Sequence, residues 1–429
     1  MKRGGVCLDF DTSLEQARAL DRRDQLGRFR DRFLIDDPGL IYLDGNSLGR
    51  VPKNSVALMD RLVRHQWGNR LIRAWNDEWM GLSRRIGAKL AGLIGALPDE
   101  VIIADSTSVN LFKLIAGALK ERQGRRKIVT DRVNFPSDIY ILKAVADLLD
   151  PAYELVVLPV DNGFAVSDEA LERAIDDDTA LVLLSHVMYK SSYMYDLARI
   201  TGIAHRRDAM ILWDLSHSAG VVPMACHDLG IDLAVGSTYK YLNGGPGAPA
   251  FLYVRDDLQS RLINPVSGWF GHRKQFYFDT EFEPAQGIDR YLTGTPSVLS
   301  LAMIEPGVDL TLEAGIGPIR TKSIGQTEYL VSLWESVLKP LGFRLNSPRN
   351  GDRRGSHVSF GHDEGYRIDQ AIREEKKVIS DFRMPDNIRL GIAPLYTTYE
   401  ELNNAVQALA EVVTSGSFRQ YSDVIEGVT

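Results

Sequence analysis

Through the middle of the chain, short runs of apolar residues alternate with segments in which apolar residues recur at helical spacing. The apolar runs are residues 101–103, 127–130, 181–184 and 210–213. Helical patterns begin near residues 109 and 137, and another covers residues 197–206. Short uninterrupted apolar runs are typical of strands that are buried on both faces. The alternation predicts an α/β fold with a mostly parallel sheet of the seven-stranded type, flanked by helices, whose ligands gather at the carboxyl ends of the strands.

The two ends of the chain show different patterns. Residues 13–33 and 51–94 are helical in pattern, with a short strand near residue 41 between them. After residue 306, long helices at 308–338 and a terminal helix at 399–414 enclose strand-like segments at 356–360 and 387–392. This change of pattern predicts a smaller α+β domain at the C-terminal end.

We therefore expect three parts along the chain. Residues 51–305 form the large domain, and residues 306–429 form the small domain. Residues 1–50 form an N-terminal segment that packs on the small domain and on a partner subunit. A chain of 429 residues is long enough for a large core and a second, smaller domain.

The composition narrows the class of protein. Hydrophobic residues make up 44% of the chain and charged residues 25%, which is ordinary for a globular protein. The net charge of -7 disfavours nucleic-acid binding, and no stretch approaches the roughly 18 apolar residues of a membrane-spanning helix. The N-terminus turns polar at once, and two cysteines, Cys7 and Cys226, do not make a disulfide framework. We expect a cytoplasmic protein without a nucleic-acid partner, a membrane contact or a metal.

Lys240 gives the strongest indication of chemistry. It lies between Tyr239 and Tyr241, after the apolar run 233–235 and before a glycine turn, where a lysine is typically neutralised or used covalently. Asp214 ends the strand at 210–213, so its carboxylate projects from a buried position where an unpaired charge is costly. A protonated pyridine nitrogen would satisfy that carboxylate. A strand-end aspartate followed by such a lysine is what pyridoxal phosphate enzymes need.

Polar turns follow the other predicted strands. The turn at residues 104–110 opens a helix and offers hydroxyls and backbone N–H groups to a phosphate, although a helix cap is an equally good interpretation. In the turn at 134–138, Phe135 could stack on an aromatic ring, whereas Asp138 could simply cap the next helix. Ser185 ends a further strand and could also face the cofactor.

Two histidines and two glycine-containing loops are weaker candidates. A lone histidine such as His186 is more often structural than catalytic. His217 follows Asp214 by three residues, so one helical turn brings both side chains to the same side, where His217 could orient the aspartate or approach the ring. The loops offer the indole N–H of Trp269 and the hydroxyl of Thr295, which could act across a dimer interface.

Eight ordered segments give the chain a specific resemblance. They are YLDGNSLG (42–49), LIRAWN (71–76), STSVNLFK (106–113), NFPSD (134–138), WDLSHSAG (213–220), TYKYLNGGPG (238–247), SGWFGH (267–272) and APLY (393–396). They span nearly the whole chain, and through them it resembles the bacterial kynureninases. These are pyridoxal phosphate enzymes of the aspartate aminotransferase fold, fold type I. The lysine motif alone would indicate only the broad superfamily.

The resemblance implies a role for each matching residue. Lys240 holds the aldehyde of the cofactor, and Phe135 stacks on its ring. Asp214 pairs with the pyridine nitrogen and is supported by His217. Further cofactor contacts are implied for Thr107, Ser108, Pro136, Ser137, Asp138, Ser185, Tyr239, Trp269 and Thr295. Arg389 matches the arginine that binds the substrate α-carboxylate, for which its planar fork of donors is well suited. The remaining implied substrate contacts are Asn46, Ser47 and Trp75.

The implied reaction is the hydrolytic cleavage of L-kynurenine to anthranilate and L-alanine in tryptophan catabolism, by a homodimer with shared active sites. Lys240 would carry the α-proton, and Tyr239 is the candidate for later proton transfers. Family members that favour 3-hydroxykynurenine tend to have histidine and asparagine where this chain has Trp75 and Thr295. Because an indole is a poor partner for an added hydroxyl, we expect a preference for unsubstituted kynurenine. Cleavage of 3-hydroxykynurenine to 3-hydroxyanthranilate stays open as a further activity.

Departures from the family pattern leave alternatives open. After the strand at 181–184 the family usually has Asn-Tyr, Thr-Gly and a His-Asp pair, whereas this chain differs at Met188, Ser191, Ser192 and Tyr195. The segment 75–79 is one residue shorter than usual. A cofactor-binding homologue with altered chemistry, or a related class V enzyme such as a cysteine desulfurase, therefore stays an alternative. A desulfurase needs a mobile nucleophilic cysteine, and neither Cys7 nor Cys226 is well placed for that role.

Overall fold

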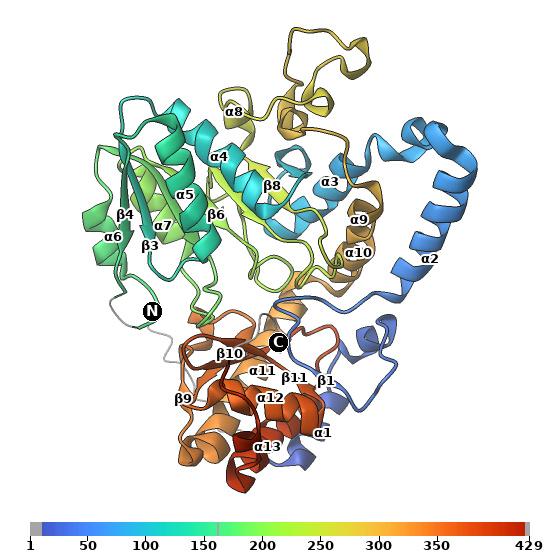
Figure 1. The fold of residues 1–429 in the computed structure, drawn as a ribbon, viewed down its shortest axis with the longest axis vertical. Coiled ribbons are helices and arrows are strands. Elements are labelled where there is room, and N and C mark those ends of the chain that lie inside the picture. The colour runs from blue at the N-terminus through green and yellow to red at the C-terminus, as the bar shows by residue number, and fades with distance from the viewer. Residues whose placement is uncertain (1–10, 161–162, 425–429) are drawn as a thin grey trace.

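The computed structural model describes residues 11–160 and 163–424, which form an upper and a lower part (Figure 1). A seven-stranded sheet forms the centre of the upper part, and a four-stranded sheet lies in the lower part. None of the described helices is long and apolar enough to cross a membrane. Cys7 and the start of the N-terminal segment lie outside the described residues.

All strands of the large sheet except one run in the same direction. Their spatial order is β2 (Val101–Ile103), β8 (Phe251–Val254), β7 (Leu233–Gly236), β6 (Met210–Asp214), β5 (Thr179–Ser185), β3 (Lys127–Asp131) and β4 (Glu154–Leu158). The exception is β8, which pairs antiparallel with β2 and β7. The predicted mostly parallel α/β sheet is therefore confirmed. Strand β4 was not predicted, although residues 155–158 form an apolar run; its side chains are only partly buried because it lies at the edge of the sheet.

Helices cover both faces of this sheet because successive strand residues point to opposite sides. Leu181 and Leu183 of β5 pack with α4 (Thr107–Glu121) and α5 (Pro136–Leu149). Val182 and Leu184 pack on the other face, in a core that they share with five further helices of the upper part. These are α3 (Leu82–Ile94), α6 (Asp168–Ala174), α7 (Leu197–His205), α9 (Val298–Ala302) and α10 (Ile304–Ala314). Every residue of β5 is buried, as the uninterrupted apolar run predicts.

The helical patterns at 13–33 and 51–94 are both interrupted. Helix α1 (Leu14–Arg22) ends just before Asp24, which pairs with the buried Lys322, and a short 3-10 helix at Gly27–Arg32 follows. Helix α2 (Lys53–Arg61) continues as a π-helical segment, Leu62–Arg70, and stops at Leu71, whose φ is 54°. A non-glycine residue in this left-handed region cannot continue a right-handed helix, so the chain bends there before it reaches α3.

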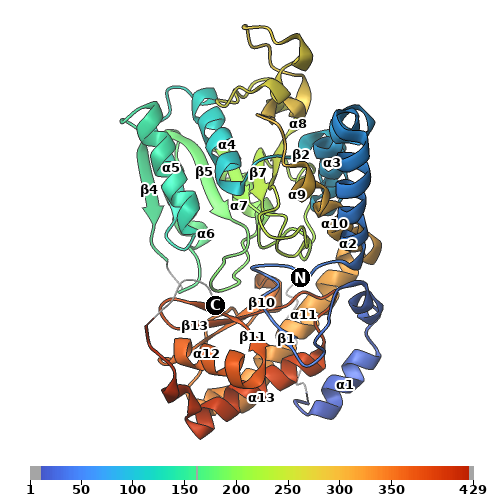
Figure 2. The same cartoon turned by 45° about the vertical axis from the view of Figure 1, so that its right-hand side comes forward.

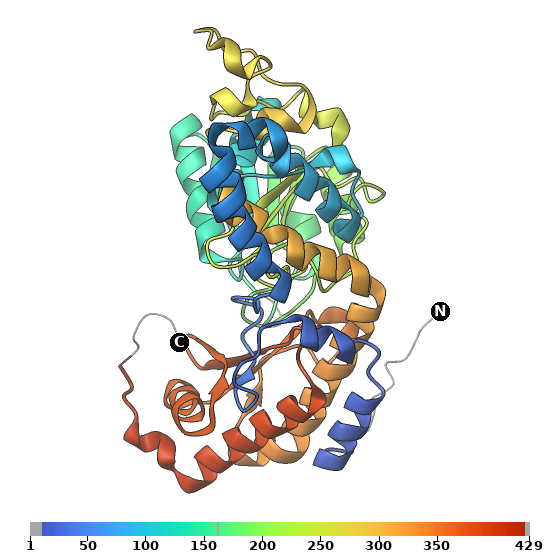
Figure 3. The ribbon, with the colours of Figure 1, turned by 90° about the vertical axis from the view of Figure 1, so that its right-hand side faces the viewer.

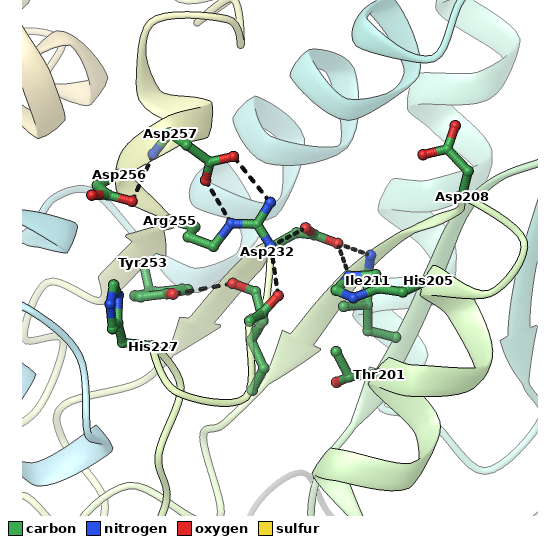
Figure 4. A network of polar contacts seen from close by, with 12 residues as sticks. Thr201, His205, Asp208, Ile211, His227, Asp232, Tyr253, Arg255, Asp256 and Asp257 are labelled. Carbon is green, nitrogen blue, oxygen red and sulfur yellow. Dashed lines mark hydrogen bonds and ion pairs between the residues drawn. The ribbon is translucent and has the colours of Figure 1, made fainter.

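A polar network around Asp232 aligns the amino ends of the central strands (Figure 4). Its buried carboxylate accepts a hydrogen bond from the backbone N–H of Ile211 at 2.9 Å. It also lies 2.9 Å from Nε2 of His205 and 3.0 Å from Nη1 of Arg255. Asp232 precedes β7, Ile211 is the second residue of β6 and Arg255 follows the antiparallel β8, so one carboxylate links three neighbouring strands at this end of the sheet. The opposite, carboxyl ends of β6 and β7 lead to Asp214 and Lys240.

The lower part is built on an antiparallel sheet. Its strands lie in the order β12 (Asp381–Arg383), β13 (Asn387–Gly391), β10 (His357–Gly361) and β9 (Arg344–Leu345). The helices packed on it are α11 (Ile316–Leu333), α12 (Gly365–Lys376) and α13 (Tyr399–Ser415), as Figure 2 shows. This arrangement matches the α+β pattern expected for the C-terminal end.

The N-terminal segment lies against the lower part (Figure 3). Strand β1 (Ile41–Tyr42) pairs parallel with β11 (Val378–Ile379), and Arg18 of α1 forms an ion pair with Glu400 of α13 at 2.8 Å. Helix α10 spans position 306 and packs on α3 of the upper part. The division of the chain at residues 50 and 305 stays a prediction. Between α8 (Asp256–Gln259) and α9 the chain extends as a long loop away from the body of the molecule (Figures 1 and 3).

Candidate active site

A cavity of about 570 Å³ opens at the carboxyl ends of the strands of the large sheet. Most of the residues predicted from the sequence line it, namely Thr107, Ser108, Phe135, Ser137, Asp138, Asp214, His217, Tyr239, Lys240 and Thr295. They come from the turns after β2, β3, β6 and β7 and from the loop before α9. Parallel strands bring these distant positions together at one edge of the sheet, as expected.

The amine of Lys240 lies against His217. Its Nζ is 3.1 Å from Nε2 and 3.5 Å from Nδ1 of the imidazole. Burial lowers the pKa of Lys240 to about 8, although the negative charges of Asp214 and Asp138 oppose this effect. Burial also lowers the pKa of His217 well below its ordinary value, and the charge of Lys240 adds to this. His217 is therefore a neutral acceptor for the lysine amine, a fraction of which is unprotonated near neutral pH.

Asp214 and Asp138 place two carboxylates in the same cavity. Oδ1 of Asp214 accepts hydrogen bonds from the backbone N–H of Ser216 at 2.9 Å and from its hydroxyl at 2.6 Å. Oδ2 of Asp138 is buried and has no hydrogen-bond partner among the described residues. Burial raises the pKa of both carboxyl groups, and for Asp138 the charge of Asp214 adds to the effect. A cation or an N–H donor in the cavity would stabilise both carboxylates.

The N-terminus of α4 forms one wall of the cavity. The hydroxyl of Ser106 caps the helix by accepting a hydrogen bond from the backbone N–H of Val109 at 3.3 Å. Thr107 and Ser108, the first two helical residues, line the cavity, and Oγ of Ser108 lies 3.3 Å from Oγ of Ser137. The first N–H groups of a helix have no partners within it, so this wall suits an anion such as phosphate. The predicted helix cap is therefore present, and it leaves room for the predicted phosphate cradle, which stays a prediction.

The other predicted cofactor contacts lie around this centre. Phe135 is 42% exposed, and its ring meets that of Tyr189 edge to face with centroids 5.4 Å apart. Pro136 begins α5 and does not line the cavity. Ser185 ends β5 and donates a hydrogen bond to the side chain of Asn134, which fixes the turn that carries Phe135. Tyr239 lines the cavity, and burial raises the pKa of its phenol.

Arg389 lies in a buried cluster of charges beside the cavity. It is 2% exposed, its guanidinium pairs with Asp381, and it donates to Oγ of Ser47 at 3.0 Å. Asn46 is fully buried, and a Cβ on Gly391 would lie 1.7 Å from its Oδ1, so only glycine fits there. The structure thus brings the predicted substrate residues Arg389, Ser47 and Asn46 to one place, although none of the three lines the cavity itself.

Trp75 and Trp269 lie apart from the cavity of their own chain. Both indoles pack on Phe270, with ring centroids 5.6 Å and 4.5 Å away respectively. Trp269 also contacts Phe276 and Phe278, which are largely exposed on the extended loop. Within the described chain, the structure therefore does not join these two predicted residues to the group around Lys240.

Several residues of the cavity wall had no predicted role in binding. The hydroxyl of Ser216 donates a hydrogen bond to Asp214. Thr293 also lines the cavity and immediately precedes the predicted glycine-containing loop at 294–296. Asp105 lies in the cradle turn and pairs with the fully buried Lys113 of α4. A lysine at an inward position of an apolar helix was the feature of the sequence that could have indicated this pair.

His186 and the unusual segment at 188–195 do not line the cavity. The ring of His186 packs against Trp213, and burial lowers its pKa to about 3, which fits the structural interpretation. Ser192 accepts a hydrogen bond from the backbone N–H of Gly355 at 2.8 Å, and the hydroxyl of Tyr195 donates to Asp131 at 2.7 Å. Met188 and Tyr195 are buried in the core of the upper part. Tyr189 of the same segment contacts Phe135, and its carbonyl accepts a hydrogen bond from Arg389. An effect of the departures at Met188, Ser191, Ser192 and Tyr195 on turnover stays a prediction.

Comparison with known proteins places these residues in a family. Residues 319–409 match the family model described as the kynureninase C-terminal domain. A kynureninase of Pseudomonas fluorescens is 44% identical over 414 residues, which cover 95% of this chain and 97% of the relative. The chain belongs to the kynureninase family. A kynureninase of Burkholderia mallei strain SAVP1 is 42% identical over 412 residues, covering 94% of this chain and 96% of the relative.

Solved structures that share the fold of this kynureninase-family chain are more distant in sequence. The apo cysteine desulfurase of Thermococcus onnurineus NA1 has a TM-score of 0.75 at 20% identity, covering 88% of this chain and 95% of that chain. A C-DES variant with glycine covalently linked to its pyridoxal phosphate cofactor has a TM-score of 0.77 at 20% identity, covering 89% and 99%. These likenesses confirm the predicted fold and nothing further.

The surroundings of Cys226 argue against the desulfurase alternative. It is fully buried, and burial raises the pKa of its thiol to about 12. A desulfurase nucleophile must be an accessible thiolate, so Cys226 is unsuited to that role.

Proposed function

We propose that this protein cleaves L-kynurenine hydrolytically to anthranilate and L-alanine, with pyridoxal phosphate as its cofactor. The observation that carries the proposal is the contact between Lys240 and His217 in a cavity that also holds Asp214, in a chain of the kynureninase family. A buried lysine with a lowered pKa is the amine that can hold an aldehyde cofactor.

The described residues fit this cofactor. The N-terminus of α4 with its neighbouring hydroxyls suits the phosphate. Asp214 suits a protonated pyridine nitrogen, because its buried carboxylate then has a cationic partner. The unpartnered Oδ2 of Asp138 offers one more acceptor in the same space. The wall therefore offers a partner for the phosphate and for the pyridine nitrogen, and Lys240 offers one for the aldehyde.

When bound, the cofactor supplies an electron sink that stabilises negative charge at the α-carbon of the substrate. Lys240 takes the α-proton from that carbon, because burial leaves part of its amine unprotonated near neutral pH. His217 accepts a hydrogen bond from Nζ of Lys240 and so keeps the amine oriented. Tyr239 lines the same cavity, and its raised pKa keeps the phenol protonated, so it is proposed as the proton donor for later steps.

Arg389 is proposed to bind the α-carboxylate of the substrate. Asp381 and Ser47 hold its guanidinium, and Nη1 donates to the backbone carbonyl of Tyr189. A guanidinium that is fixed in advance loses little side-chain entropy when it binds a carboxylate. The amide of Asn46 is buried without a partner among the described residues and offers a further polar contact.

Two further proposals involve Trp75, Trp269 and Thr295. Trp75 and Thr295 are proposed to favour unsubstituted kynurenine. Trp269 and Thr295 are proposed to act across the interface of a homodimer. Thr295 lines the cavity, whereas both indoles lie outside the cavity of their own chain. The extended loop exposes Phe276 and Phe278, which are 59% and 72% exposed, and such an apolar surface is typical of a protein interface. We propose that a second subunit covers this loop and that the two subunits share active sites. Light scattering on the purified protein measures the subunit number directly.

The proposed setting is the cytoplasm, in tryptophan catabolism. The low cysteine count supports the cytoplasm, and the family supports the pathway.

Product analysis tests the proposed function. Protein loaded with pyridoxal phosphate is incubated with L-kynurenine and, separately, with 3-hydroxykynurenine, and the products are quantified by chromatography. We expect anthranilate and L-alanine in equal amounts, with L-kynurenine as the faster substrate. Retained cofactor without cleavage of either compound would indicate an altered homologue instead, and release of sulfide from cysteine would indicate a desulfurase.

A further inference from the structure

A buried lysine and a partly exposed aspartate form an ion pair beside the wall that is proposed to bind the phosphate. Lys113 is fully buried on α4, and its Nζ pairs with the carboxylate of Asp105. The same amine donates to the backbone carbonyl of Tyr291 at 2.8 Å and lies 3.5 Å from Oδ1 of Asn110. A charged amine at a fully buried position loses its hydration, so this set of acceptors must hold it in place.

Asp105 connects this amine to the cavity. It lines the cavity directly before Ser106 and Thr107, in a left-handed conformation with φ of 44°. Its carboxylate accepts a hydrogen bond from Oγ1 of Thr293 at 3.2 Å. The conformation is unfavourable for a non-glycine residue, so the pairing of the side chain offsets a local cost.

The position of Asp105 creates an electrostatic conflict. The cradle for a phosphate dianion begins one residue after it, and like charges at such short range repel strongly in a partly buried site. Lys113 lies on the protein side of the carboxylate and cancels its charge. It also joins Tyr291 to α4, which fixes the start of the loop that carries Thr293 and Thr295.

We propose that Lys113 is a positioning residue for the cofactor phosphate, which neutralises Asp105 and ties the loop at 291–297 to the N-terminus of α4. This inference rests on the proposed function, because it assigns the phosphate of pyridoxal phosphate to this wall. Lys113 touches neither substrate nor cofactor and acts through Asp105 and the loop.

The test compares pyridoxal phosphate with pyridoxal, which has the aldehyde and ring but no phosphate. Dissociation constants of both compounds for the cofactor-free protein are measured by absorbance titration. We expect Lys113→Met to weaken pyridoxal phosphate binding about 10- to 100-fold, because an uncompensated carboxylate then faces the dianion. Binding of pyridoxal should change less than about 3-fold, because it lacks the dianion.

The double variant Lys113→Met with Asp105→Asn removes both charges. We expect it to restore most of the affinity for pyridoxal phosphate, since an uncharged amide no longer repels the dianion. Lys322→Met is the matched control, because Lys322 is likewise a buried lysine in an ion pair, 2.6 Å from Asp24, away from the cavity. It should leave the ratio of the two dissociation constants unchanged.

Equal losses for the two compounds, or no recovery in the double variant, would overturn the inference and leave a structural role. If Lys113→Met does not fold, Asp105→Asn alone tests the inference. In this variant the affinity for pyridoxal phosphate should rise relative to the affinity for pyridoxal. A fall in the affinity for pyridoxal phosphate relative to pyridoxal would overturn the inference. A wild-type protein that binds no pyridoxal phosphate would contradict the proposed function. Normal wild-type binding with unchanged ratios in the variants would contradict only the role of Lys113.

Discussion

Replacing Lys240 by methionine should stabilise the cofactor-free protein at neutral pH. Methionine keeps a similar length of side chain and removes the amine. Burial lowers the pKa of Lys240 from the ordinary value of 10.5 to about 8, so the folded cavity disfavours the charged amine. Keeping a charged amine in the buried site before the cofactor binds therefore lowers the stability of the folded protein.

The magnitude follows from the difference between the two pKa values. At about 1.36 kcal/mol per pKa unit, the protonated amine costs the folded state about 3 kcal/mol. Part of the side chain reaches the open cavity, where water screens the charge, so we expect a measured gain of about 2 kcal/mol. The folded pKa lies below the unfolded one. The cost is therefore fully present below pH 8, shrinks as the pH rises and is absent above 10.5.

Urea denaturation of the two cofactor-free proteins between pH 7 and pH 10 measures this difference in the free energy of unfolding. Lys120→Met is the control, because Lys120 is an exposed lysine on α4 and its replacement should have little effect at any pH. Equal stability of wild type and Lys240→Met at pH 7, or a difference that grows with pH, would refute the assignment of a lowered pKa to this lysine.

Three further predictions concern the substrate site and the alternative function. Arg389→Lys should raise KM for L-kynurenine about 10- to 100-fold, because an ammonium cannot form the paired hydrogen bonds of a guanidinium; a KM within twofold of wild type in steady-state assays would argue against carboxylate binding here. Trp75→His should raise the ratio of kcat/KM for 3-hydroxykynurenine over L-kynurenine about tenfold, since an imidazole can bond to the added hydroxyl; an unchanged ratio would separate Trp75 from ring selection. In a Cys7→Ser variant, Cys226 should resist a thiol reagent in the native protein and react fully in denaturant. The reason is that burial raises the pKa of Cys226 to about 12. Rapid labelling of the native protein would reopen the desulfurase alternative.

Elements buried on both faces could be predicted from the sequence. β5 and β6 each contain an uninterrupted apolar run, and the structure has both strands where the pattern placed them. The bend at Leu71 could not be predicted, because the helical spacing of apolar residues continues through a position whose φ is 54°. A single backbone angle breaks the helix without changing the pattern.

The candidate site could likewise be predicted only in part. Asp214 and Lys240 could be predicted because Asp214 ends β6 and Lys240 follows β7, and strand ends meet at one edge of a parallel sheet. The pairing of Arg389 with Asp381 could not, because it depends on the register of β12 against β13, in which the two residues stand opposite each other. The pairing of Lys113 with Asp105 depends in the same way on the left-handed turn at Asp105.

The chemistry proposed for this chain depends on Lys240 as the residue that holds the cofactor. Borohydride reduction of the protein loaded with pyridoxal phosphate, followed by mass mapping of its peptides, tests this most directly. We predict one reduced cofactor adduct per chain, located on Lys240, and none on that peptide in Lys240→Met. An adduct on another lysine, or the absence of an adduct under conditions in which L-kynurenine is cleaved, would contradict the assignment.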